Sequence, residues 1–154
     1  MVRKKTGIML GIMVVFLLAS TLPSWGQGIG IRAGRYLDTE KYFLGGELIS
    51  RVTGNLYFNP NAEYVFLDNV TYMTFNLDFH YDFYTRSALF FWLGSGLGIL
   101  YRNPEGPPGS NVDLAANLII GVGLDTFAGL VPYVQGKYIT SDAGEFVAAV
   151  GLRF

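Results

Sequence analysis

The chain has 154 residues, enough for one domain, and a formal net charge of −1. Hydrophobic residues make up 51% of it and charged residues only 15%, an unusually apolar composition for a soluble domain. The sequence has no basic patch that would indicate nucleic-acid binding. No internal apolar run is long enough for a spanning helix, and without cysteine no disulfide can contribute stability. The 20 glycines and an aromatic content of 16% favour strands and tight turns.

The N-terminus is typical of an export signal. Its basic residues are Arg3, Lys4 and Lys5. An apolar core over residues 8–19 follows, and Ser24 and Gly26 are small residues at the two positions that a signal peptidase inspects. We expect a signal peptide over residues 1–26 and a mature domain over residues 27–154, whose net charge would be −4 once the three basic residues are removed. The alternative, an uncleaved membrane anchor, needs a longer apolar core.

Beyond residue 26, apolar and polar residues alternate with the period of a β-strand. The predicted strands are 27–36, 43–52, 56–67, 72–84, 88–102, 112–125, 130–140 and 145–154. Short turns are expected at 53–55, 85–87 and 126–129, and generally longer or more polar connections at 37–42, 68–71, 103–111 and 141–144. Ten residues at ~3.3 Å each and a ~40° tilt rise ~25 Å, the height of an outer-membrane apolar band.

Residue Pro60 interrupts one of these stretches. Proline cannot donate to a strand ladder, so it predicts a bulge or a local break. The apolar phase is the same before and after Pro60, which favours one continuous strand over 56–67.

Alternation alone fits a soluble barrel with an oily interior and a membrane barrel with an oily exterior. Residues Met73 to Phe83 place six large apolar side chains on one face, too many for a narrow interior. Glycines alternate on the opposite face of 88–102, which suits a crowded interior, while tyrosines and Trp92 lie near strand ends as in an interfacial girdle. These features favour lipid outside.

The polar phase then faces the lumen, where its charges are close to balanced. The predicted lumen network is Arg32, Glu47, Arg51, Glu63, Asp78, His80, Asp82, Asp113, Asp125, Lys137 and Arg153. Lipid leaves these groups no other place to be solvated, so they are expected to pair with each other.

The last strand is expected to pair with the first and to seal the cylinder. Its apolar phase is Phe146, Ala148, Val150, Leu152 and Phe154. An open strand edge cannot exist in lipid, so closure is required of any barrel that spans a bilayer.

This pattern resembles the small eight-stranded outer-membrane barrels of the OmpA/OmpX type over essentially the whole mature chain. The resemblance rests on the terminal strand and on the glycine-alternating stretch Gly94, Gly96, Gly98. It implies an all-β, antiparallel up-and-down transmembrane barrel in the outer membrane of a Gram-negative-type cell. It also implies that the barrel-assembly machinery reads the terminal strand, and that outer-membrane lipid and lipopolysaccharide surround a monomer.

The sequence offers little catalytic chemistry. His80, flanked by Asp78 and Asp82, could be a base or a metal ligand, but its inward phase favours a structural hydrogen bond. Outer-membrane lipid A deacylases use a Ser–His–acid site on the outer face, and the chain has no His-x-Ser pair.

We therefore expect a non-catalytic outer-membrane barrel with a structural or surface-interaction role and no cofactor or metal. The alternatives are a narrow conduit or binder for a small apolar molecule, and a lipid A-modifying hydrolase. Side chains fill an eight-stranded interior, so an open pore is not expected.

Overall fold

The alternating stretches form strands in the computed structural model of the protein, which describes residues 28–104, 109–126, 128–141 and 144–154. The strands are β1 (Gly28–Tyr36), β2 (Lys41–Thr53), β3 (Leu56–Leu67), β4 (Val70–Tyr84), β5 (Leu89–Pro104), β6 (Asn111–Leu124), β7 (Val131–Thr140) and β8 (Glu145–Arg153). Every predicted strand is confirmed, with bounds within two residues of those expected. The predicted signal peptide lies outside the described residues.

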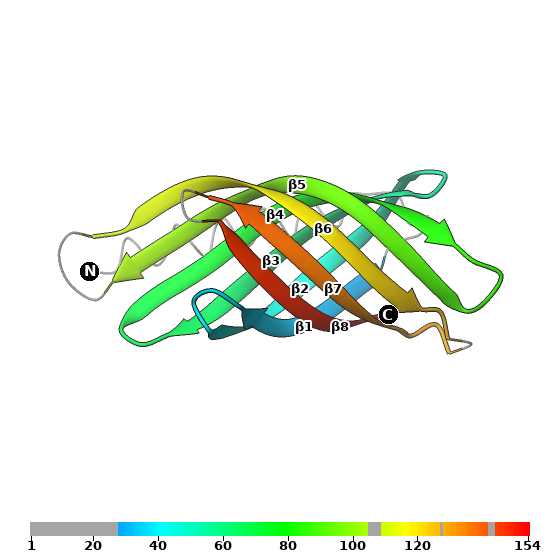
Figure 1. Cartoon of the computed structure of the whole chain (residues 1–154), viewed down its shortest axis with the longest axis horizontal. Coiled ribbons are helices and arrows are strands. Elements are labelled where there is room, and N and C mark those ends of the chain that lie inside the picture. The colour runs from blue at the N-terminus through cyan, green and yellow to red at the C-terminus, as the bar shows by residue number, and fades with distance from the viewer. Residues whose placement is uncertain (1–27, 105–108, 127, 142–143) are drawn as a thin grey trace.

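The strands close into a barrel in which each is antiparallel to its neighbours in the chain (Figure 1). Closure is made by β1 and β8, which pair from Gly30 with Arg153 to Tyr36 with Val147. Beyond that ladder the peptide groups of Ile29 and Phe154 exchange hydrogen bonds of 2.9 and 2.8 Å. The predicted cylinder is confirmed, and it has no open edge.

No described segment forms a helix with the length and apolar character needed to cross a membrane.

The polarity of the barrel wall is inverted relative to a soluble protein. On β4, Leu77 is 56% and Phe79 46% exposed, whereas Asp78 is 0% and His80 1% exposed. The same alternation runs along the other strands, with aliphatic and aromatic side chains outward. The predicted orientation, oily face out and polar face in, is confirmed.

The structure shows how β3 accommodates Pro60. The β3–β4 register is continuous through Pro60, which pairs with Leu77. On the other side, the β2–β3 ladder has no pairs opposite Pro60 and Asn59, yet the register is the same before and after the gap. The side-chain amide of Asn59 donates to the carbonyl of Leu48 at 2.9 Å, in place of the N–H that proline lacks. The result is a local break without a bulge.

The connection between β3 and β4 is shorter than the predicted loop over residues 68–71. Only Asp68 and Asn69 separate the strands, because β4 already begins at Val70. Asn69 has φ of 57°, the left-handed conformation that tight hairpins need and that asparagine tolerates better than most residues.

Two apolar clusters lie inside the barrel, one near each end. The cluster at the end that holds the end of β1 and the start of β8 is Tyr36, Phe43, Val65, Tyr72, Leu100, Ala115, Ile139, Val147 and Ala149. The cluster at the end that holds the start of β1 and the end of β8 is Phe90, Trp92, Ile119 and Tyr133. The polar interior lies between them.

Candidate functional site: the polar lumen

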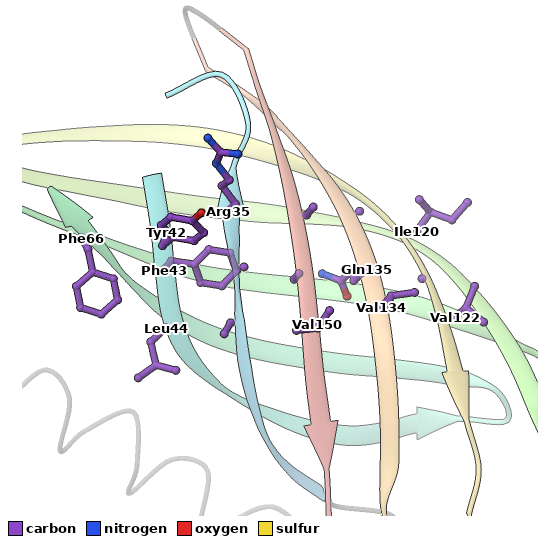
Figure 2. A pocket seen from close by; sticks show the side chains of 16 residues that line it. Arg35, Tyr42, Phe43, Leu44, Phe66, Ile120, Val122, Val134, Gln135 and Val150 are labelled. Atoms are coloured by element: carbon purple, nitrogen blue, oxygen red, sulfur yellow. The ribbon is translucent and has the colours of Figure 1, made fainter. Parts of the chain in front are cut away.

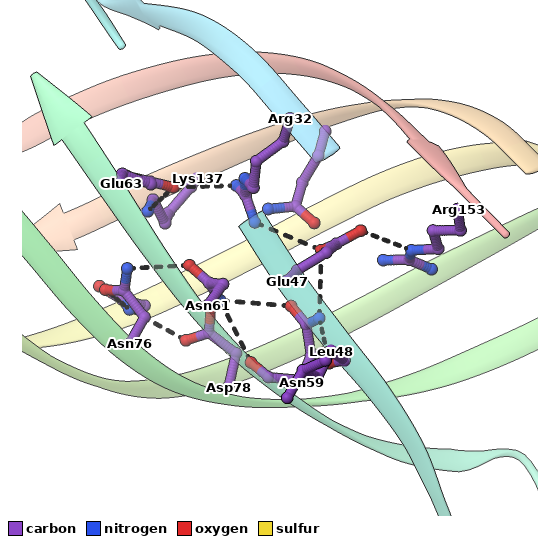
Figure 3. Close-up of polar contacts among 12 residues, drawn as sticks. Arg32, Glu47, Leu48, Asn59, Asn61, Glu63, Asn76, Asp78, Lys137 and Arg153 are labelled. Atoms are coloured by element: carbon purple, nitrogen blue, oxygen red, sulfur yellow. Dashed lines mark hydrogen bonds and ion pairs between the residues drawn. The ribbon is translucent and has the colours of Figure 1, made fainter. Parts of the chain in front are cut away.

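The centre of the lumen holds an ion network built from five strands (Figure 3). Glu63 accepts from the ammonium of Lys137 at 2.8 Å and lies 3.2 Å from the Arg32 guanidinium. Glu47 accepts from Nε of Arg153 at 2.9 Å and lies 3.6 Å from the other end of the Arg32 guanidinium. All five side chains are buried, and Arg32 links the Glu63–Lys137 and Glu47–Arg153 pairs into one network.

A layer of carboxamides extends this network across β3, β4 and β6. Asp78 accepts from Asn61 and from Asn117, both at 2.9 Å, and Asn76 donates to Asn61 at 2.9 Å. Asn59 links the layer to Glu47 at 3.1 Å. These asparagines lie on the inward phase of their strands, which was the signal for them. The predicted network contained only charged residues and His80, so it did not include these asparagines.

Glycines on β5 provide the room for this layer. A Cβ at Gly96 would collide with the Asp78 carboxylate and with the neighbouring strand's backbone, and one at Gly94 with His80. The inward glycine phase of β5 therefore gives space to the larger polar side chains of β4.

His80 follows Asp78 on the inward face of β4, and one of its ring nitrogens has a hydrogen-bond partner. Its Nδ1 is 2.7 Å from Oδ1 of Asp82, and its ring stacks on Tyr57 with centroids 5.5 Å apart. Its Nε2 is buried and has no hydrogen-bond partner among the described residues. The ring has a polar contact on one side and aromatic packing on another, next to Trp92.

Three charged residues of the predicted network lie outside it. Arg51 is exposed at the end of β2, where it donates to the Tyr57 hydroxyl at 2.8 Å. Asp113 is half-buried near the opposite mouth beside Asn111, and Asp125 is exposed just after β6. Alternation predicts the side of the wall and not the depth, and these three side chains lie near the ends of the barrel, where they reach water.

Trp92 is a second correction, because it is not part of an interfacial girdle. It is 1% exposed inside the barrel, where its indole N–H donates to Gln135 at 3.2 Å. The guanidinium of Arg153 lies 4.7 Å from its ring centroid. Gly121 on β6 makes the space, since a Cβ there would collide with the indole. Trp92 shares the phase of the β5 glycines, and this was the sequence signal for its position.

The residues of the predicted assembly signal lie on the outer face of β8, except Phe154, which directly follows the strand. Phe146, Val150 and Phe154 are exposed, as is Ala148, and Leu152 is half-buried. Their reading by an assembly machinery stays a prediction.

No protein-family model and no curated protein matches the sequence. Solved structures do match the fold. The N-terminal β-barrel domain of Pseudomonas aeruginosa OprF superposes with a TM-score of 0.70 at 18% identity, covering 83% of this chain and 95% of that one. Neisserial surface protein A gives 0.61 at 14% identity, covering 82% and 93%. The outer membrane enzyme PagL gives 0.55 at 15% identity, covering 82% and 98%.

The chain has the fold of the small outer-membrane barrels. At these identities the likeness concerns architecture alone, and the resemblance drawn from the terminal strand and the glycine phase of β5 is confirmed at that level.

The small outer-membrane barrel fold carries catalysis in PagL, so the chemistry must be judged from the residues. His80 faces the lumen and is 1% exposed, so it is not accessible from the outer face of the barrel. Within the described part of the chain, no three His, Cys, Asp or Glu side chains are grouped so that they could hold a metal ion.

Proposed function

We propose that the chain is a non-catalytic integral protein of the outer membrane whose barrel has a structural or surface-interaction role. The observation that carries this proposal is the inverted polarity of the wall. Buried ion pairs such as Lys137–Glu63 lie inside, and exposed side chains such as Leu114, Leu97 and Val150 lie outside.

The solvent that fits this wall is hydrocarbon. Monomeric soluble proteins rarely expose contiguous apolar patches larger than a few hundred Å². Here the apolar face continues around every strand of the closed barrel. In lipid the outward apolar side chains have no unfavourable contact with water. The closed ladder also leaves no unpaired backbone edge.

We place the start of β1 and the end of β8 toward the periplasm, so that the connection after β5, one of the two longest, faces outward as the longer loops of outer-membrane barrels do. The start of β1 and the end of β8 share one end of the barrel with the turns after β2, β4 and β6. In this orientation the connections after β1, β3, β5 and β7 face outward, where surface partners would meet them. Surrounding lipid and lipopolysaccharide, the barrel-assembly machinery during biogenesis and a monomeric state belong to the same proposal.

The interior favours a closed barrel over a conduit. Aromatic and aliphatic side chains occupy both ends of the lumen, and ion pairs fill the middle. We therefore expect no single-channel conductance from the reconstituted chain.

Fractionation of cells that express the full chain tests the proposal. The protein should sediment with outer membranes, resist carbonate extraction, and migrate faster on gels unheated than boiled, because a closed barrel stays folded in detergent. Recovery as a soluble periplasmic protein without heat-modifiable migration would contradict the membrane assignment.

A further inference from the structure

The outer wall of the barrel contains a recess of about 950 Å³ whose lining residues come from six strands. Strand registers explain its position. Residues paired across neighbouring strands form rows around the barrel, and one outward-facing row reads Tyr42, Arg35, Ala148, Gly136 and Ile120. Ala148 and Gly136, in the middle of this row, have small side chains or none, so they leave a hollow between their larger neighbours.

Bulkier rows flank the recess on both sides. One contains Val150, Val134 and Val122 on β8, β7 and β6, and Figure 2 shows their side chains on these successive strands. The other contains Phe146 and Tyr138, whose ring centroids are 4.6 Å apart. The recess is therefore a trench, with Ala148 and Gly136 as its floor.

Packing does not require the missing side chain on that floor. A Cβ added at Gly136 would lie 3.6 Å from a methyl of Ile120, an ordinary contact. At the inward Gly96 and Gly121, by contrast, a Cβ would collide with Asp78 and Trp92. The inward glycines are explained by the filled lumen, whereas Gly136 leaves a space that the fold itself does not need.

One end of the trench carries a positive charge. Arg35 lies near the end of β1, at the mouth opposite the start of β1 and the end of β8, and its guanidinium carbon is 5.5 Å from the Tyr42 ring centroid (Figure 2). Its Nε has no hydrogen-bond partner among the described residues, and its Nη2 lies 3.5 Å from the largely exposed carboxylate of Glu40. Such exposed pairs are weak, so the guanidinium remains available for a phosphate, which it can bind through two N–H groups.

A second copy of the chain does not fit the trench. In a two-fold dimer the same patch faces itself, and two hollows in opposition would leave a void where close packing is needed. An acyl chain is narrow enough to lie along the floor, and a phosphate on the same lipid would complement Arg35.

We propose that this trench binds a phosphorylated, acylated glycolipid of the outer leaflet, namely the lipid A part of lipopolysaccharide. One acyl chain lies over Ala148 and Gly136, and one phosphate contacts Arg35. The inference rests on the membrane location and orientation proposed above, because only then is Arg35 at the outer-leaflet headgroups.

Native mass spectrometry of the folded, detergent-purified chain tests the proposal. The probes are bisphosphorylated lipid A and its dephosphorylated form, and each variant is first shown to be heat-modifiable. Wild-type protein should retain the phosphorylated probe about fivefold better than the dephosphorylated one. Gly136→Leu should lower the retention of both probes about fivefold by filling the trench. Arg35→Gln should lower only that of the phosphorylated probe.

Gly46→Leu is the matched control. Gly46 also faces outward, a Cβ there would have its nearest contact at 3.8 Å, and it lies outside the trench. Its retention of both probes should equal that of the wild type. Equal effects of the two leucine substitutions, equal retention of the two probes by the wild type, or no effect of Arg35→Gln would each overturn the proposal. Absence of the chain from the outer-membrane fraction of cells would instead refute the proposed function. The lipid A measurement is made in detergent, so its result does not depend on that fractionation.

Discussion

Glu63 is the residue whose replacement best tests whether the lumen is a dry, paired network. Its carboxylate accepts from Lys137 at 2.8 Å, from the Tyr36 hydroxyl at 2.7 Å and from Thr74 at 3.1 Å, and it also lies 3.2 Å from Arg32. Glu63→Gln keeps the shape but removes the charge. Hydrogen bonds to charged groups contribute ~1.5–3 kcal/mol each, and breaking a buried ion pair costs ~3–5 kcal/mol.

We expect Glu63→Gln to lower the free energy of unfolding by ~3–5 kcal/mol, because Lys137 and part of Arg32 are left buried without a counter-charge. Urea unfolding of the barrel in lipid vesicles, followed by heat-modifiable migration and by the fluorescence of buried Trp92, measures it. Adding Lys137→Met should recover at least ~1 kcal/mol, because it removes one orphaned charge.

Glu40→Gln is the control for the same chemical change at an exposed carboxylate, and no measurable loss is expected. If Glu63→Gln cost less than ~1 kcal/mol, or if the second substitution recovered nothing, water would be solvating these charges. The account of the lumen as a paired, dehydrated network would then be wrong.

Three further predictions concern the wall. Asn59→Ala should lower the free energy of unfolding by ~1–3 kcal/mol in the natural background and by less when combined with Pro60→Val, since valine restores the missing peptide donor; a double-mutant cycle in urea measures the difference. Gly96→Ala should cost ~1–3 kcal/mol in the same assay because its methyl group collides with Asp78, and wild-type stability would show that the glycine is not a packing requirement. Leu77→Lys should cost ~2–4 kcal/mol in vesicles, and a neutral result would place Leu77 outside the hydrocarbon.

The strands, their approximate bounds and the side of the wall that most residues face could be predicted from the amino-acid sequence. These properties are local, because alternation with period two is a property of neighbouring residues in one stretch of chain. Phe79 and His80 are adjacent in sequence and lie on opposite sides of the wall, as their phase predicts. The pairing of β8 with β1 was predicted on a different ground, because a barrel in lipid cannot leave a strand edge unpaired.

The depth of each side chain in the barrel and its interaction partners could not be predicted in this way, because they depend on how distant strands are paired. Arg51 and Glu47 share a phase, but only the register places one at an exposed mouth and the other in a buried network. Trp92 enters the lumen because Gly121, far away in the sequence, lies opposite it. The trench likewise exists because Ala148 and Gly136 are paired across β8 and β7. Which side chains meet across strands depends on registers set between distant segments, and no single stretch of the chain contains that information.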